Sequence, residues 1–74
     1  MLLIRITDEG EPVTTAPVSM QFDGWRRIEQ FTDHNGEIRV EPCLGSAVHL
    51  TINGTDHGVH ICHDGMELDI DLSD

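Results

Sequence analysis

Apolar and polar residues alternate at every second position along most of this chain, and this period constrains the fold more than any other feature. The apolar positions that share one parity form five groups: Leu2, Ile4, Ile6; Val18, Met20, Phe22; Ile38, Val40; Val48, Leu50, Ile52; and Met66, Leu68, Ile70, Leu72. A period of two places these side chains on one face of a strand. No stretch of about 11 residues shows the 3.6-residue period of a helix. The sequence therefore predicts an all-β protein.

Turn residues separate these groups and predict how the last strands pair. Asn53-Gly54 and Asp64-Gly65 tolerate the positive φ angles of two-residue hairpin turns. Two such hairpins predict a C-terminal three-stranded meander. Its register pairs Ile52 with Thr55, Leu50 with His57, Val48 with Val59, His60 with Asp69, and Val59 with Ile70. Val59 and Ile61 then face the core, and His60 and Cys62 face outward.

The segment from Trp25 to Thr32 is strand-like but poorly phased. Trp25 and Phe31 fall on one parity and Ile28 falls on the other. We expect a β-bulge within this segment.

The length and the charge limit the classes of function. A chain of 74 residues makes one domain, 1–74. Fourteen acidic residues face four arginines, lysine is absent, and the formal net charge is −10. This charge argues against nucleic acid and an anionic membrane as partners and favours cationic partners or metal ions. We see no secretory signal or membrane-length apolar segment, and we expect a cytoplasmic protein.

Histidine, cysteine and acidic residues crowd the C-terminal part and form a candidate metal site. In the predicted meander the outward residues would be His49, His60, Cys62 and Asp69, which could hold a divalent ion weakly. The interpretation we favour is a solvated polar face without a cofactor, with a pH-sensing role for the histidines as a further alternative.

The two cysteines, Cys43 and Cys62, allow one disulfide at most, and we favour two free thiols. A Cys62–His60 nucleophile pair is the basis of a weaker alternative, a small enzyme. A flat sheet face offers such a pair neither a pocket nor an oxyanion hole. We therefore expect no catalytic site.

Trp25, Arg26 and Arg27 follow a turn and are the best candidates for partner contacts. A tryptophan beside two arginines has the composition of an interface hot spot. The alternative is that Trp25 covers one end of the core.

Three motifs resemble those of carboxypeptidase-regulatory-like domains and occur in the order found in that family. They are ITDEGEPVTTAPVSM (6–20), FTDHNGEIRV (31–40) and EPCLGSAVHLTING (41–54). The resemblance implies a small seven-stranded, transthyretin-like Greek-key β-sandwich. From the residues themselves we expect positive φ angles at Gly10 and Gly36, and Asp33 to cap its own turn through side-chain hydrogen bonds. The DHNGE turn has too few oxygens for calcium.

Proteins that carry out covalent chemistry on a similar fold have residues that this chain lacks. Hydroxyisourate hydrolases need a C-terminal tyrosine motif, and lysine-based isopeptide bonds need lysine; the chain contains neither residue. We therefore expect a non-catalytic binding or accessory module that acts through protein–protein contacts. The partner is an unknown protein, and a homodimer through exposed edge strands is an alternative. The second candidate function is metal binding by the outward His/Cys/Asp cluster.

Overall fold

The computed structural model describes residues 1–23, 27–41, 43 and 45–73, and within them the chain is all β. Its strands are β1 (Leu2–Asp8), β2 (Glu11–Pro12), β3 (Pro17–Phe22), β4 (Arg27–Phe31), β5 (Glu37–Val40), β6 (Ala47–Ile52), β7 (Thr55–Ile61) and β8 (Glu67–Asp71). This confirms that the chain is all β, as the alternation predicts. The described residues form no helix that could span a membrane.

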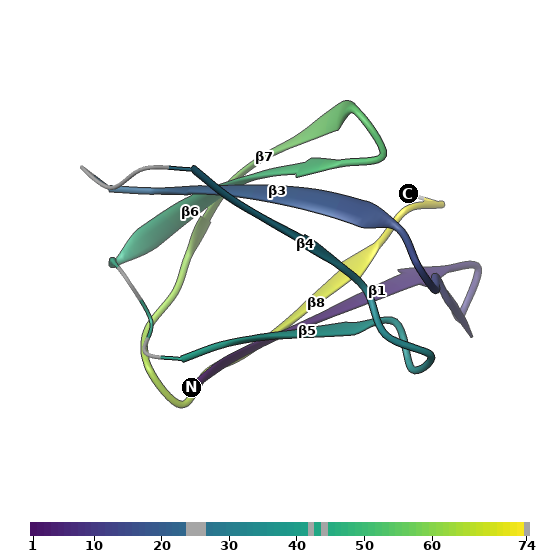
Figure 1. Ribbon diagram of the computed structural model, residues 1–74, viewed down its shortest axis with the longest axis horizontal. Coiled ribbons are helices and arrows are strands. Elements are labelled where there is room, and N and C mark those ends of the chain that lie inside the picture. The colour runs from purple at the N-terminus through teal and green to yellow at the C-terminus, as the bar shows by residue number, and fades with distance from the viewer. Residues whose placement is uncertain (24–26, 42, 44, 74) are drawn as a thin grey trace.

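The strands form two four-stranded sheets that lie one above the other (Figure 1). In the first sheet β1 pairs with β2 and β5 in antiparallel fashion and with β8 in parallel. The second sheet has the order β4-β3-β6-β7 and is antiparallel throughout. The chain therefore crosses between the sheets after β2, after β4, after β5 and after β7.

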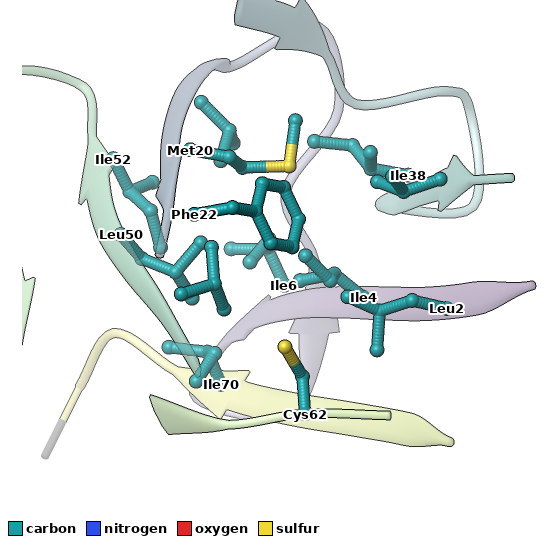
Figure 2. Close-up of a cluster of buried hydrophobic side chains, with 13 residues drawn as sticks. Leu2, Ile4, Ile6, Met20, Phe22, Ile38, Leu50, Ile52, Cys62 and Ile70 are labelled. Carbon is teal, nitrogen blue, oxygen red and sulfur yellow. The ribbon is translucent and has the colours of Figure 1, made fainter. Parts of the chain in front are cut away.

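The core lies between the two sheets and contains the apolar positions that the alternation marks. Figure 2 shows side chains from both sheets meeting there. Leu2, Ile4 and Ile6 of β1 are fully buried, as are Val48 and Leu50 of β6. Burial of each such side chain contributes about 1.5–3 kcal/mol relative to exposure, so these strands supply much of the stability of the fold.

The predicted C-terminal meander is wrong, because β8 joins the other sheet. It pairs in parallel with β1, from Leu3 opposite Glu67 to Thr7 opposite Asp71. Leu68 and Ile70 fall beside Ile4 and Ile6 of β1, so β8 adds its apolar face to a strand that is already buried. The alternation within β8 is equally compatible with either neighbour. The Asp64-Gly65 segment therefore connects the sheets and does not close a hairpin.

The β6–β7 hairpin forms at Asn53-Gly54 as predicted, but its register shifts by one residue farther from the turn. Ile52 pairs with Thr55, and Asn53 and Gly54 have φ angles of 52° and 81°. An irregularity then intervenes, and Val48 lies opposite His60 instead of the predicted Val59. The insertion of one residue into a strand inverts the faces of every residue that follows.

This inversion reverses the predicted orientation of the end of β7. Val59 and Ile61 are 67% and 77% exposed, whereas Cys62 is 1% exposed. His60, opposite the buried Val48, is half-buried on the core side. The expectation that Val59 and Ile61 enter the core and that His60 and Cys62 face outward is therefore wrong.

No bulge occurs in the described part of the segment from Trp25 to Thr32. β4 pairs regularly with β3 from Arg27 to Phe31. The phase conflict has a simpler cause, because Phe31 points to solvent and is 67% exposed, while Ile28 packs against the core.

Candidate functional site

A β-bulge at Gly58 shapes the outer face of the second sheet. Gly58 has a φ angle of +81°, and its amide donates a hydrogen bond to Oδ1 of Asp56 at 2.7 Å. Nε2 of His49 lies 2.8 Å from the same oxygen. Because an ionised carboxylate only accepts, Nε2 carries the proton in this contact. The Gly58 amide, and after it His49, lowers the pKa of Asp56. The carboxylate thus ties the bulge in β7 to β6.

The strand pairing places four side chains in one row across this face. Arg27 lies opposite Gln21, Gln21 lies opposite His49, and His49 lies opposite Val59. Nε of Arg27 donates to Oγ of Ser19 at 2.5 Å. The row therefore runs from a cationic end at β4 to an apolar end at β7.

A shallow hollow of about 270 Å³ lies along this row. It is lined by Ser19, Gln21, Arg27, His49 and Thr51. Because it is shallow and open to solvent, it suits the side chains of a docked chain better than an enclosed ligand.

The predicted partner contacts fall only partly on the described structure. Trp25 and Arg26 lie outside the described residues. Arg27 begins β4, is exposed, and forms the cationic end of the row across the second sheet.

The structure does not bring the four candidate metal ligands together. His49 lies on the outer face of the second sheet beside Asp56. His60 is on the core side, with Nε2 2.9 Å from the carbonyl oxygen of His57, and Cys62 is buried. Asp69 belongs to the first sheet.

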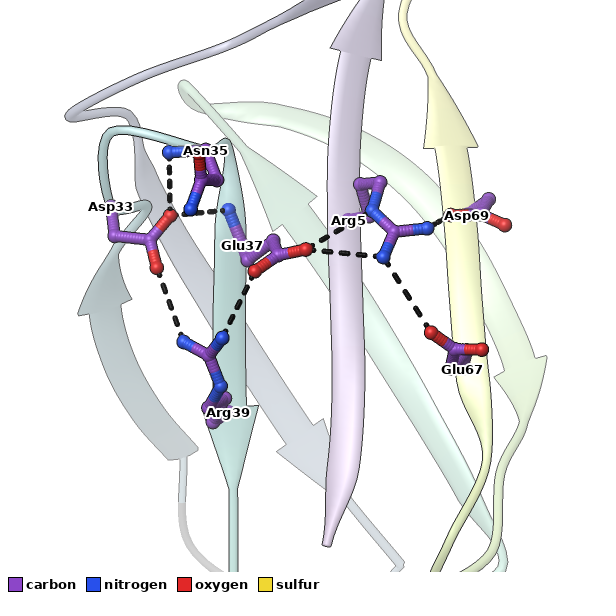
Figure 3. Close-up of polar contacts among 7 residues, drawn as sticks. All are labelled: Arg5, Asp33, Asn35, Glu37, Arg39, Glu67 and Asp69. Atoms are coloured by element: carbon purple, nitrogen blue, oxygen red, sulfur yellow. Dashed lines mark hydrogen bonds and ion pairs between the residues drawn. The ribbon is translucent and has the colours of Figure 1, made fainter.

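The predicted His60–Asp69 pair is wrong, because β7 and β8 belong to different sheets. In place of His60, Nη1 of Arg5 donates to Oδ1 of Asp69 at 3.1 Å (Figure 3). Within the described residues, no group of three or more His, Cys, Asp or Glu side chains is placed to hold a metal ion.

The outer face of the first sheet carries a network of ion pairs. Arg5 contacts Glu37, Glu67 and Asp69 across three strands, as Figure 3 shows. Glu37 also contacts Arg39. Two arginines therefore pair with an excess of carboxylates on this face, in contrast to the second sheet with its apolar end at β7.

The expected turn at Asp33 is confirmed. Its Oδ1 accepts hydrogen bonds from the amides of Asn35 at 2.8 Å and Glu37 at 3.0 Å. These amides are the main reason that the pKa of Asp33 is lowered. Gly10 and Gly36 have the expected positive φ angles, of 82° and 73°.

The two cysteines are not bonded to each other in this structure, but they lie close together. Their Sγ atoms are 3.7 Å apart. Burial first, and the contact with Cys43 second, raise the pKa of Cys62 to about 11. A cysteine that attacks an external substrate needs a lowered pKa, so the environment of Cys62 argues against the Cys62–His60 catalytic pair.

Comparisons with family models, curated proteins and solved structures find no match to this chain. The surface of the second sheet is therefore the basis on which a function can be proposed. The sequence contains a pattern that indicates the bulge in β7. Asp56 precedes Gly58 by two residues inside a strand pattern, where an Asx side chain can accept the glycine amide and glycine often marks a bulge.

Proposed function

We propose that this chain is a non-catalytic binding module that takes up an extended, basic segment of a partner protein along β7. The observation that carries the proposal is the exposure of Val59 and Ile61, 67% and 77%, on the terminal strand of the second sheet. Two large aliphatic side chains at alternate positions form an apolar strip, and such strips on a sheet edge are typical of strand addition.

The free edge of β7 supports strand addition after the bulge. In the described structure β7 pairs with β6 and with no strand on its other side. A bulge disturbs regular pairing, so the usable edge begins after Gly58. The residues from Val59 to Ile61 include no acid, lysine or arginine that would discourage an incoming strand.

The opposite edge is less suited to the same role. β4 carries Arg27 and Glu29 on the outer face, and charged residues on an edge strand discourage pairing with another chain. Phe31, at the end of β4, is its one large exposed apolar side chain among the described residues. We therefore place the docked segment on β7.

The negative net charge of the chain favours a basic partner segment. At a formal net charge of −10, two copies repel each other, which disfavours a homodimer through β7. A segment that alternates aliphatic residues with lysine or arginine complements the apolar strip and the acidic protein at once. Its association rate should fall as the ionic strength rises.

The resemblance to carboxypeptidase-regulatory-like domains supports the same class of function. We infer that the two sheets are a variant of that Greek-key sandwich, in which the domain itself performs no catalysis. Strand β8 in parallel beside β1 and the short β2 bring the described strands to eight. Trp25, Arg26 and Arg27 remain proposed partner contacts, and Arg27 lies at the other end of the row across the second sheet.

The test is selection of linear peptides from a displayed library against the intact chain. The Val59→Asp/Ile61→Asp variant is compared with Phe31→Asp, because Phe31 is as exposed as Val59 and lies at the opposite edge of the same face. Selected peptides should alternate aliphatic and basic residues. The double variant should lose at least about tenfold in affinity, and Phe31→Asp should retain it.

Two results would overturn this proposal. The first is binding that Phe31→Asp abolishes and the β7 variant retains, which would move the contact to β4. The second is that the wild-type chain forms a homodimer in sedimentation and the β7 variant is a monomer.

A further inference from the structure

The thiols of Cys43 and Cys62 converge on one point of the structure. Their Sγ atoms are 3.7 Å apart, and they lie 3.2 Å and 3.5 Å from the same carbonyl oxygen, that of Gly45. A disulfide requires a separation of about 2.05 Å. The fold therefore holds the two sulfur atoms in contact, about 1.7 Å beyond the bonded separation.

Cys43 and Cys62 lie in different connections between the two sheets, so a disulfide between them would link those connections. Cys43 lies between β5 of the first sheet and β6 of the second, and Cys62 directly follows β7 on the way back to β8. The two crossings run at the same end of the molecule (Figure 1). The amide of Cys62 also donates to the carbonyl of Ser46 at 3.0 Å. A disulfide would therefore tie together two separate connections between the sheets.

The two thiols differ in their access to solvent. Cys43 is partly buried, whereas Cys62 is 1% exposed and its sulfur points into the core (Figure 2). A dissolved reagent thus reaches Cys43 first. The raised pKa of Cys62, about 11 against an ordinary 9.0, lowers its thiolate fraction at neutral pH about a hundredfold.

We propose that Cys43 and Cys62 are a redox site that forms a reversible disulfide by exchange with a low-molecular-weight disulfide such as oxidised glutathione. Cys43 loses its proton, and its thiolate attacks one sulfur of the reagent and releases one glutathione thiolate. Cys62 then loses its proton to solvent and attacks Sγ of Cys43, which releases the second glutathione. Two protein thiols are oxidised, and one glutathione disulfide is reduced to two thiols.

The oxidised form should be the more stable one. The bond closes a loop between residues 19 positions apart and so restricts the unfolded chain. It should raise the melting temperature on the order of 10 °C. The disulfide is independent of the proposed binding at β7. It involves the buried Cys62 and not the exposed Ile61, and it needs no partner protein.

Mass spectrometry of the folded chain after incubation with oxidised glutathione tests the proposal. The wild type should lose two hydrogen atoms, retain no glutathione, and yield one peptide that joins the two cysteines. Cys62→Ala should retain one glutathione on Cys43, because the second thiol is missing. Cys43→Ser should react more slowly while folded and readily in urea, because the fold buries Cys62.

Two outcomes would overturn the proposal. One is a wild-type chain that accumulates stable glutathione on Cys43 without closing the bond. The other is folded Cys43→Ser that reacts as fast as the wild type. Melting of the wild type with and without reductant supplies a readout that needs no variant, and an unchanged midpoint would also contradict the proposal.

Discussion

The carboxylate of Asp56 accepts the amide of Gly58 at 2.7 Å, and this contact stabilises the bulge that turns Val59 and Ile61 to solvent. Beyond the bulge, His60 and Cys62 take the inner positions of the chain. The bulge that this contact stabilises therefore determines two properties of the molecule. It creates the exposed apolar strip on β7, and it delivers the Cys62 thiol to Cys43.

Two isoleucines on neighbouring strands provide a direct test of this inversion. Ile52 is 1% exposed and Ile61 is 77% exposed. Ile52→Ala should reduce the free energy of unfolding by about 2–5 kcal/mol, through lost burial and a cavity. Ile61→Ala should change it by less than about 0.5 kcal/mol. Urea denaturation measures both, and an equal loss at the two positions would show that β7 follows the unbroken register.

Two glycines with similar backbone angles should respond differently to alanine. Gly58 has a φ of +81° and nothing within 4 Å of an added Cβ, so Gly58→Ala should cost about 1–2 kcal/mol from backbone strain alone. At Gly36 the added Cβ would lie 2.6 Å from the carbonyl oxygen of Ile6. Gly36→Ala should therefore cost about 3 kcal/mol or more, because overpacking adds to the strain.

Gly58→Ala and Gly36→Ala serve as controls for each other, because both substitutions add the same methyl group at a positive φ. Chemical denaturation of the two variants and the wild type gives the difference. A Gly58→Ala chain that is as unstable as Gly36→Ala would mean that the bulge is packed more tightly than the structure shows.

Asp71 should titrate well below an ordinary aspartate. The hydroxyl of Ser73, followed by its amide, lowers the pKa of Asp71 to about 2 from 3.8. A lowered folded-state pKa means that this contribution to stability is fully present above about pH 4 and is lost as the pH falls toward 2. Carboxyl-carbon NMR measures the midpoint directly. Ser73→Ala should raise it, and an unchanged midpoint would place the cause elsewhere.

Arg5 should contribute stability that depends on salt. It faces Glu37, Glu67 and Asp69, and in a chain of net charge −10 its removal leaves three carboxylates without this cation. Arg5→Gln should lower the urea midpoint at low ionic strength, and the loss should shrink at high ionic strength because salt screens the repulsion.

Arg27→Gln is the matched control for Arg5, since Arg27 lies on the other sheet and donates to the Ser19 hydroxyl instead of to a carboxylate. Its effect should depend much less on salt. If both arginine variants lost the same stability at every ionic strength, the network on the first sheet would contribute through packing and not through charge.

Several features of the fold could be read from residues that act locally. The alternation in β1, β3, β5 and β6 marked the core side of each strand, and Asn53-Gly54 marked a hairpin, because a strand face and a positive-φ turn are properties of adjacent residues. Asp33 identified its own turn for the same reason. These predictions required no knowledge of which strands become neighbours.

The tertiary structure decided the rest. Alternation shows which side of a strand is buried but not which strand lies beside it, so Leu68 and Ile70 fitted a hairpin with β7 as well as the parallel pair with β1. The extra residue near Gly58 inverted the end of β7, because the faces of a strand alternate with a period of two. Cys43 lies close to Cys62 because the end of β7 is inverted and because β8 joins the first sheet. This proximity depends on two crossings between the sheets that no local pattern records, because contacts between distant segments arise only when the sheets pack together.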